Sequence, residues 1–288
     1  MVSTLNPTAG TSLLDDQAAG LRKLFAGARG AATVAFAGAA GRGMPVAGLA
    51  RGLAAAGKEV IVIDENAGAN NVAAAFGLRS RFDLLQAVNR DVPAAQVLLW
   101  PEAGIRLLPA ARAARQCARL GAMERRALTE WLHRLQKGID FILVDTADRP
   151  GVEFSPLLPQ PQRIVIAAAP DSPSITEAYA QMKRLAQQGD CRHFDVVILR
   201  AASPAEGHTV FANLREVARR HLGAELDLLG CLSERTDAAR SGHALAESFL
   251  ELPRAAAGGD CPDAGADVRR APQGGPLRGA AVAQRVMV

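Results

Sequence analysis

The sequence predicts an α/β protein with a doubly wound, mostly parallel sheet and helices on both faces. Apolar, strand-like runs alternate with helix-like stretches from residue 33 to residue 232. The runs are five to seven residues long and almost wholly apolar, as parallel strands covered on both faces require. A glycine-rich turn joins the first run to the first long helix-like stretch, as in many open α/β sheets. Right-handed crossovers then favour the doubly wound arrangement.

Hydrophobic periodicity assigns each element. The expected strands are residues 33–37, 59–64, 105–110, 140–146, 163–169, 195–200 and 226–232. The expected helices are residues 45–56, 70–76, 82–89, 121–137, 174–188 and 209–222, with a last helix that ends before Pro253. The prediction is one domain over residues 30–253, an N-terminal segment over 1–29 and a disordered tail over 254–288, which is rich in Ala, Gly, Pro and Arg.

Composition excludes several classes of function. No run of 18 apolar residues occurs in the 288, so no membrane span is expected. The net charge of +4 is spread along the chain, which gives little support for nucleic-acid binding. The four cysteines lie far apart and the five histidines are scattered, so no metal site is expected. The N-terminus lacks the pattern of a secretory signal, and a cytoplasmic location is the expectation.

The turn AGAAGRGMP, residues 37–45, is the main candidate for a ligand site. A phosphate-binding loop needs glycines for its tight path, backbone N–H groups at a helix N-terminus, a lysine, and a hydroxyl for Mg²⁺. Here the backbone donors and the cation would come from Gly38, Gly41, Arg42, Gly43 and Met44. The lysine and the hydroxyl are missing. A glycine-rich turn alone is a weak signal.

The surrounding sequence makes the signal stronger, because it resembles the deviant Walker A loop of the MinD/ParA ATPases, KGGVGKTT in that family. Ala37 falls where the family has its signature lysine, Arg42 replaces the phosphate lysine, and Gly43 replaces the Mg²⁺-binding threonine. The following VAGLARGLAAAGKEVIVID is similar to the family's helix and second strand. The resemblance implies the P-loop NTPase fold, with ATP and Mg²⁺ as cofactors.

The same resemblance assigns roles to two carboxylates. Asp64 matches the first Asp of the family's DxD segment, with Asn66 at the second position, and Asp145 matches the Walker B Asp that holds Mg²⁺ through water. Leu199 falls where the family often has an adenine-binding Asn. If the enzyme is active, Asp64 and Asp145 are its catalytic residues. The missing signature lysine, the arginine in place of the phosphate lysine and the missing hydroxyl together predict slow or absent hydrolysis, while nucleotide binding stays open.

The segment SLLDDQAAGLRKLFAG, residues 12–27, predicts a short amphipathic helix with Leu13, Leu14, Ala18, Leu21 and Phe25 at helical spacing. Such a helix can dock in a partner's groove or pack on its own domain. Its DQAAGLR resembles the DQAxxLR motif of FlhG proteins, MinD relatives that control flagellar number and position. The resemblance implies that Asp16, Gln17, Leu21 and Arg22 contact the signal-recognition-type GTPase FlhF and stimulate GTP hydrolysis.

Three functions stay under consideration. The leading one is a regulator of flagellar number and placement with a degraded ATP site, which acts through its N-terminal helix. The alternative is a working ATPase switch that dimerises around ATP. A DNA-segregating ParA-like protein is disfavoured by the dispersed charge. Glutamates and Pro253 around the last helix disfavour the family's direct membrane binding, and recruitment to the membrane or cell pole through a partner is left open.

Overall fold

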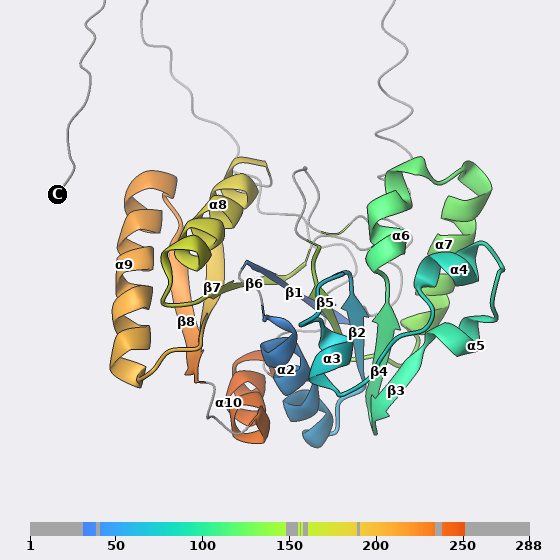
Figure 1. Cartoon of the computed structure of the whole chain (residues 1–288), viewed down its shortest axis with the longest axis horizontal. Coiled ribbons are helices and arrows are strands. Elements are labelled where there is room, and N and C mark those ends of the chain that lie inside the picture. The colour runs from blue at the N-terminus through green and yellow to red at the C-terminus, as the bar shows by residue number, and fades with distance from the viewer. Residues whose placement is uncertain are drawn as a thin grey trace, which may run out of the picture. The chain divides into compact units, whose positions relative to one another are not determined.

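The computed structural model describes residues 31–38, 41–147, 155, 157, 161–188, 191–233 and 238–250. Within them, eight strands form one sheet in the order β3-β4-β2-β5-β1-β6-β7-β8 (Figure 1). Every pairing is parallel except that of β3 with β4. The predicted fold class is confirmed. The predictions for the segment 1–29 and the tail 254–288 lie outside the described residues.

The elements keep the predicted order. The strands are β1 (Ala32–Gly38), β2 (Val60–Asp64), β3 (Leu99–Glu102), β4 (Ile105–Pro109), β5 (Phe141–Asp145), β6 (Arg163–Ala168), β7 (His193–Leu199) and β8 (Glu225–Leu232). The helices are α2 (Gly43–Ala55), α3 (Val72–Ala75), α4 (Leu84–Val88), α5 (Ala94–Val97), α6 (Ala111–Gln116), α7 (Ala122–Leu135), α8 (Ser172–Gln188), α9 (Pro204–Leu222) and α10 (Ala238–Leu250), with a 3-10 turn η1 (Cys117–Arg119). None of the described helices is both long enough and apolar enough to cross a bilayer.

Sequence patterns missed some short elements and one helix start. β3 has four residues, includes Pro101 and is only half-buried, so it lacks the apolar run of a central strand. α9 begins at Pro204, five residues before the prediction, because the Ser203 hydroxyl caps it by accepting a hydrogen bond from the Glu206 N–H. Proline at the first helical position suits such a start.

Helices cover both faces of the sheet, as Figure 1 shows. On one face, side chains such as Val34 and Phe36 of β1 pack against α2, α3 and α10. On the other face, Ala35 packs in a cluster with α4 to α7, and Ala37 packs in a cluster with α8 and α9. Alternate residues of one strand therefore enter cores on opposite faces, which is why the strands read as continuous apolar runs.

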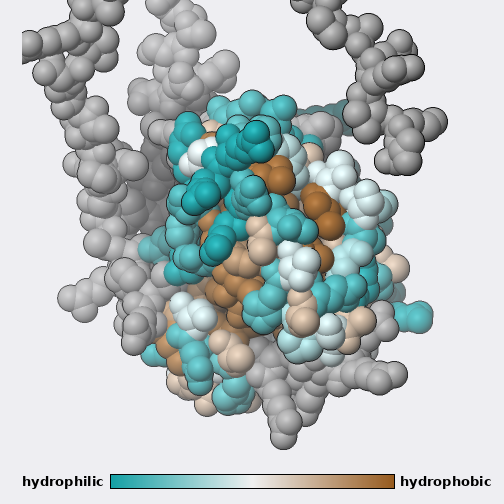
Figure 2. All heavy atoms as spheres, turned by 90° about the vertical axis from the view of Figure 1, so that its left-hand side faces the viewer, coloured by the Kyte–Doolittle hydropathy of each residue, from teal (hydrophilic) through white to brown (hydrophobic). Residues whose placement is uncertain are grey.

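The sheet ends at β8 on one side. From Leu228 to Leu232 this strand is only partly buried. Figure 2 views the molecule from the side that carries β8 and α9, and shows hydrophobic side chains in a strip between hydrophilic ones.

Candidate functional site

The candidate site lies where three neighbouring strands end. β5 lies between β2 and β1, so Asp145 is in register with Asp64 on one side and with Phe36 on the other. The turn after β1 leads into α2 and brings Arg42 to the same edge. Ligands of doubly wound sheets bind at the carboxyl ends of the strands, at the point where the order of the strands in the sheet reverses. The structure therefore brings the residues around 38–44, 64 and 145 together.

Arg42 points into the protein. Its side chain is 1% exposed, and its Nε donates to Oδ1 of Asp145 at 2.6 Å. Nη1 donates to the Gly38 carbonyl at 2.6 Å, and Nη2 donates to the Thr146 carbonyl. The guanidinium thus joins the ends of β1 and β5 from within. The sequence predicted Arg42 as a cation facing a phosphate, whereas here its charge is matched by the carboxylate at the Walker B position.

Asp145 is fully buried and has a second donor. Its Oδ2 accepts from Nδ2 of Asn66 at 3.2 Å, so both carboxylate oxygens are hydrogen-bonded within the protein. Asn66 is the residue that the sequence resemblance matches to the second aspartate of the DxD segment. An aspartate there would bring a like charge to Asp145, whereas the amide of Asn66 supplies a donor. The Asn66 side chain therefore joins the loop after β2 to Asp145.

Gly43 is enclosed by that loop. A Cβ added at Gly43 would come within 2.6 Å of the Asn71 carbonyl carbon and 2.7 Å of the Asn70 oxygen. Asn71 is held in place as the N-cap of α3, where its Oδ1 accepts from the Ala74 N–H at 2.9 Å. No side chain, and so no threonine hydroxyl, fits at position 43 unless this backbone moves. The next residue, Met44, is 52% exposed.

Asp64 is buried beside Asp145. Burial, and next the negative charge of Asp145, raise the pKa of Asp64 to about 7, although backbone N–H groups such as that of Ala73 lower it. Its oxygens accept from the N–H groups of Asn66 and Ala73, both at 3.2 Å. Asp64 therefore holds the loop after β2 and the start of α3 at the sheet edge. Burial beside a second carboxylate therefore favours the protonated form of Asp64 well above the pH at which an exposed aspartate ionises.

The glycines of the turn differ in their surroundings. Gly38 has φ +99°, and a Cβ there would meet the Ala167 carbonyl oxygen of β6 at 2.4 Å. Gly41 has φ +93°, and its nearest neighbour would be Nη1 of Arg200 at 3.9 Å. Both conformations favour glycine. Leu199, predicted at the adenine position, is buried in the core, and it is the next residue, Arg200, that lies beside the turn.

Sequence reasoning missed Arg200 and Glu65. Arg200 follows β7 directly and pairs with Asp171 at 3.0 Å. Glu65 follows Asp64, is 1% exposed and accepts a short hydrogen bond from the Ser155 hydroxyl. The rule that strand ends form the site would have selected Arg200, because it comes directly after an apolar run. Nothing in the sequence marks Glu65 as buried, since its partner lies 90 residues away.

These described residues do not fit a magnesium nucleotide. The guanidinium of Arg42 pairs with Asp145, the Asp145 carboxylate accepts two protein donors, and position 43 has no room for a side chain that could carry a hydroxyl. Magnesium in such sites is bound through one or two carboxylates, waters and the phosphates of the substrate, and a carboxylate already paired with a guanidinium attracts it less. In this arrangement the guanidinium carries the positive charge that a metal ion would carry.

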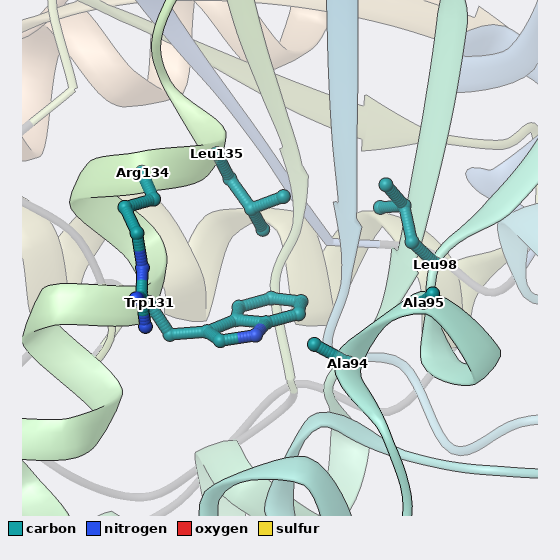
Figure 3. A pocket seen from close by; sticks show the side chains of 6 residues that line it. All are labelled: Ala94, Ala95, Leu98, Trp131, Arg134 and Leu135. Atoms are coloured by element: carbon teal, nitrogen blue, oxygen red, sulfur yellow. The ribbon is translucent and has the colours of Figure 1, made fainter.

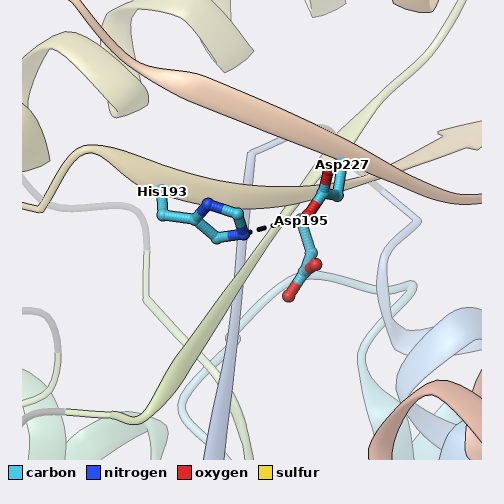
Figure 4. A group of neighbouring side chains, drawn as sticks. All are labelled: His193, Asp195 and Asp227. Carbon is cyan, nitrogen blue, oxygen red and sulfur yellow. Dashed lines mark ion pairs between the residues drawn. The ribbon is translucent and has the colours of Figure 1, made fainter.

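A second polar cluster lies across β7 and β8. Ligand atoms of His193, Asp195 and Asp227 lie within 4.8 Å of one another, and Nε2 of His193 is 3.1 Å from Oδ2 of Asp227 (Figure 4). Asp195 is fully buried and both of its oxygens accept from Arg163 of β6. A cation at Asp195 would compete with this bidentate pair. The cluster is a polar network across β6, β7 and β8. The sequence did not reveal it, because its members come from three separate segments of the chain.

Comparison with solved structures identifies the fold. MinD of Aquifex aeolicus aligns with a TM-score of 0.55 at 19% identity, over 76% of this chain and 97% of that one. A putative plasmid partition protein of Borrelia burgdorferi bound to AMPPNP gives 0.54 at 16% identity, over 77% and 98%. MinD of Pyrococcus horikoshii with Mg-ADP gives 0.53 at 14% identity, over 77% and 97%. The chain has the fold of the MinD/ParA P-loop NTPases.

Curated relatives narrow the class. The antiactivator FleN of Pseudomonas aeruginosa is 29% identical over 184 residues, 64% of this chain and 66% of its own. The flagellum site-determining protein YlxH of Helicobacter pylori is 26% identical over 198 residues, 68% of this chain and 66% of its own. The match thus spans just under two thirds of each relative's length. No protein-family model matches. The chain is a homologue of these flagellar regulators, as its sequence predicted.

Proposed function

We propose that this chain regulates flagellar number, placement and assembly by docking on partners, with a nucleotide site that has become a structural element. The observation that carries the proposal is the buried pair of Arg42 with Asp145. Homology to FleN and YlxH supports the flagellar role. The pair supports the second part, because it fills with protein groups the positions that phosphate and metal charges would need.

The charge balance of the site explains how one arginine can stand in for a metal ion and a lysine beside a buried aspartate. A buried aspartate without a partner costs several kcal/mol, roughly the desolvation of one ion. An NTPase offsets that cost with its metal ion and lysine, whereas this chain offsets it with one guanidinium that also satisfies two carbonyls. Phosphoryl transfer depends on positioned cations and metal around the phosphates. Without them we expect hydrolysis to be weak or absent and ATP binding to be weak.

Docking on the partner is assigned to the N-terminal segment. The DQAAGLR string places Asp16, Gln17, Leu21 and Arg22 in the motif that contacts the FlhF-type GTPase in the resembling family. These residues lie outside the described part of the chain, so the assignment rests on the motif. The regulator would act in the cytoplasm and reach the membrane or the cell pole through this partner.

Nucleotide binding tests the first half of the proposal. The full chain is titrated with fluorescently labelled ATP with and without Mg²⁺, and its size in solution is measured under the same conditions. We expect no affinity increase from Mg²⁺ and no nucleotide-dependent change of size. Stoichiometric ATP binding that requires Mg²⁺ and pairs two copies would instead establish the working switch.

Stimulation of the GTPase tests the second half. GTP hydrolysis by a purified FlhF-type GTPase is measured with the wild-type chain, with Gln17→Ala/Leu21→Ala and with the control Lys23→Ala, which lies outside the motif. The double variant should lose stimulation while the control retains it. Equal stimulation by all three proteins would refute the docking role. Circular dichroism checks that the domain keeps its fold.

A further inference from the structure

An apolar groove lies between α5 and α7, on the sheet face away from α2. It encloses about 340 Å³ and is lined by Ala94, Ala95, Leu98, Trp131, Arg134 and Leu135. Figure 3 shows the Trp131 ring reaching from α7 toward Ala94, with Leu98 and Leu135 above it on opposite sides. Trp131 is only partly buried. The groove is therefore a shallow apolar surface around one aromatic side chain.

α7 presents a second apolar stripe beside the one that faces the sheet. Leu128 and Leu132 are the buried residues that pack on the sheet. Met123, Ala127, Trp131 and Leu135 follow at intervals of four and none of them is buried, with Met123 82% exposed. A row at this spacing forms a ridge of the kind that packs against another helix. From Met123 to Leu135 it rises over twelve positions, or about 18 Å at 1.5 Å per residue.

The chain enters the domain beside this groove. The Ala32 N–H donates to the Asp140 carbonyl at 2.8 Å, and Asp140 is five positions beyond Leu135 at the end of α7. Ala31 packs against the same hydrophobic cluster as Leu98, Trp131 and Leu135. Residue 31 therefore lies near the end of α7 that carries Leu135.

We propose that residues 12–27 of the same chain form the amphipathic helix that covers this groove. Their apolar stripe runs from Leu14 to Phe25, eleven positions or about 17 Å, which matches the ridge on α7. Residues 28–30 then form the connection, and three residues reach about 10 Å. Phe25 enters the groove nearest to the connection, and the stripe continues along α7 toward Met123.

Charge supports the same occupant. The surface of α7 and the turn after it carries Arg125, Arg126, Arg134 and Lys137 against Glu124 and Glu130. The far end of the segment brings Asp15 and Asp16, which lie toward the arginines near the start of α7 because the two helices then run parallel. Such rim charges set orientation more than they add affinity.

One consequence rests on the proposed function. Leu21 belongs both to the stripe that covers the groove and to the motif assigned to the GTPase, so the helix cannot occupy both places at once. Docking on the partner then requires release from the chain's own domain. Only the fraction of chains whose helix is released from the groove could bind the partner, so the apparent affinity for the partner would fall in proportion to that fraction.

Trp131 itself reports on the groove. The sequence has two tryptophans, and Trp100→Phe leaves Trp131 as the single emitter in the full chain. Phe25→Asp in that background places a charge on the stripe, and Ala19→Asp places the same charge on the opposite face as a control. Ala95→Glu charges the groove instead, at an exposed helix position, and Gln96→Glu is its control outside the lining.

Phe25→Asp and Ala95→Glu should each shift Trp131 emission to the red and remove its protection from acrylamide, while both controls match the parent. A synthetic peptide of residues 12–27 added to the Phe25→Asp protein should restore the parent emission. Emission that is identical in all five proteins would overturn the proposal. A shift that appears only on dilution would also overturn it, since the occupant would then be a second copy. Phe25 is outside the GTPase motif, so this test can fail while the Gln17→Ala/Leu21→Ala test succeeds.

Discussion

Replacing Arg42 by alanine tests whether the pair with Asp145 is structural. The substitution removes the Nε–Oδ1 bond of 2.6 Å and leaves two buried carbonyls, those of Gly38 and Thr146, without this donor. Removing one partner of a buried ion pair costs about 3–5 kcal/mol, because the other charge stays buried. A domain of this size has a total stability of about 5–15 kcal/mol. The loss is therefore a large part of the whole.

Urea unfolding followed by circular dichroism measures this loss, and thermal unfolding gives an independent value. For a domain of roughly 150–250 residues, each kcal/mol lowers Tm by about 2–4 °C, so we expect a fall of about 6–20 °C. Arg42→Lys should cost less than the alanine variant, because one ammonium keeps the charge but cannot reproduce the planar fork toward three acceptors.

Arg51→Ala is the matched control. Arg51 also pairs with a carboxylate, Glu102 at 2.7 Å, but its side chain is 28% exposed and that of Glu102 is 45% exposed. Pairs this accessible contribute about 0–1 kcal/mol. If Arg42→Ala loses no more stability than Arg51→Ala, Arg42 is not a structural group, and its natural role would then be that of a cation for a bound phosphate.

Three further predictions follow from the site and its supports. The pKa of Asp64 is raised from 3.8 to about 7, so between these values the folded state keeps a proton that the unfolded state loses. Stability should therefore fall as pH rises from 5 to 7, by at most about 1.4 kcal/mol per pH unit. Urea titrations should show this slope in the wild type and a flatter one in Asp64→Asn. Gly43→Thr should lower the urea midpoint rather than create magnesium binding, because its Cβ would meet the backbone of residues 70–71; magnesium-dependent ATP binding by this variant would refute the argument. Gly242→Ala should destabilise the packing of α10 on α2 by about 1–3 kcal/mol, since the new methyl group would lie 2.2 Å from a carbonyl oxygen of α2, and unchanged thermal unfolding would contradict this.

Much of the fold could be predicted from periodicity. The apolar runs from residue 33 to 232 correspond to all the strands of the sheet except β3. The long helices were also found, since each needs one apolar stripe. β3 and α5 were missed because four-residue elements at an edge carry too few periodic positions to stand out. Part of the site was predictable as well, since the ends of consecutive parallel strands must lie at one edge.

The direction in which Arg42 points could not be predicted. Its residue type is compatible with a phosphate ligand, and the carboxylate that it pairs with lies 103 residues later in the chain. Glu65 shows the same limit, because only the folded chain brings the Ser155 hydroxyl to its carboxylate. The spacing of Met123, Ala127, Trp131 and Leu135 is visible in the sequence, yet only packing on the sheet decides that this stripe of α7 is not fully buried.

The sequence alone determined the order of strands and helices, the edge at which the site forms and the relationship to flagellar regulators, because these depend on local periodicity and on motifs that are contiguous in the chain. Only the tertiary structure decided that the Arg42 guanidinium of the loop pairs with the buried Asp145 carboxylate, and that the sheet leaves a second apolar stripe of α7 only partly buried. Such outcomes depend on which groups from distant segments come within hydrogen-bonding distance, and on which stripe of a helix the sheet buries.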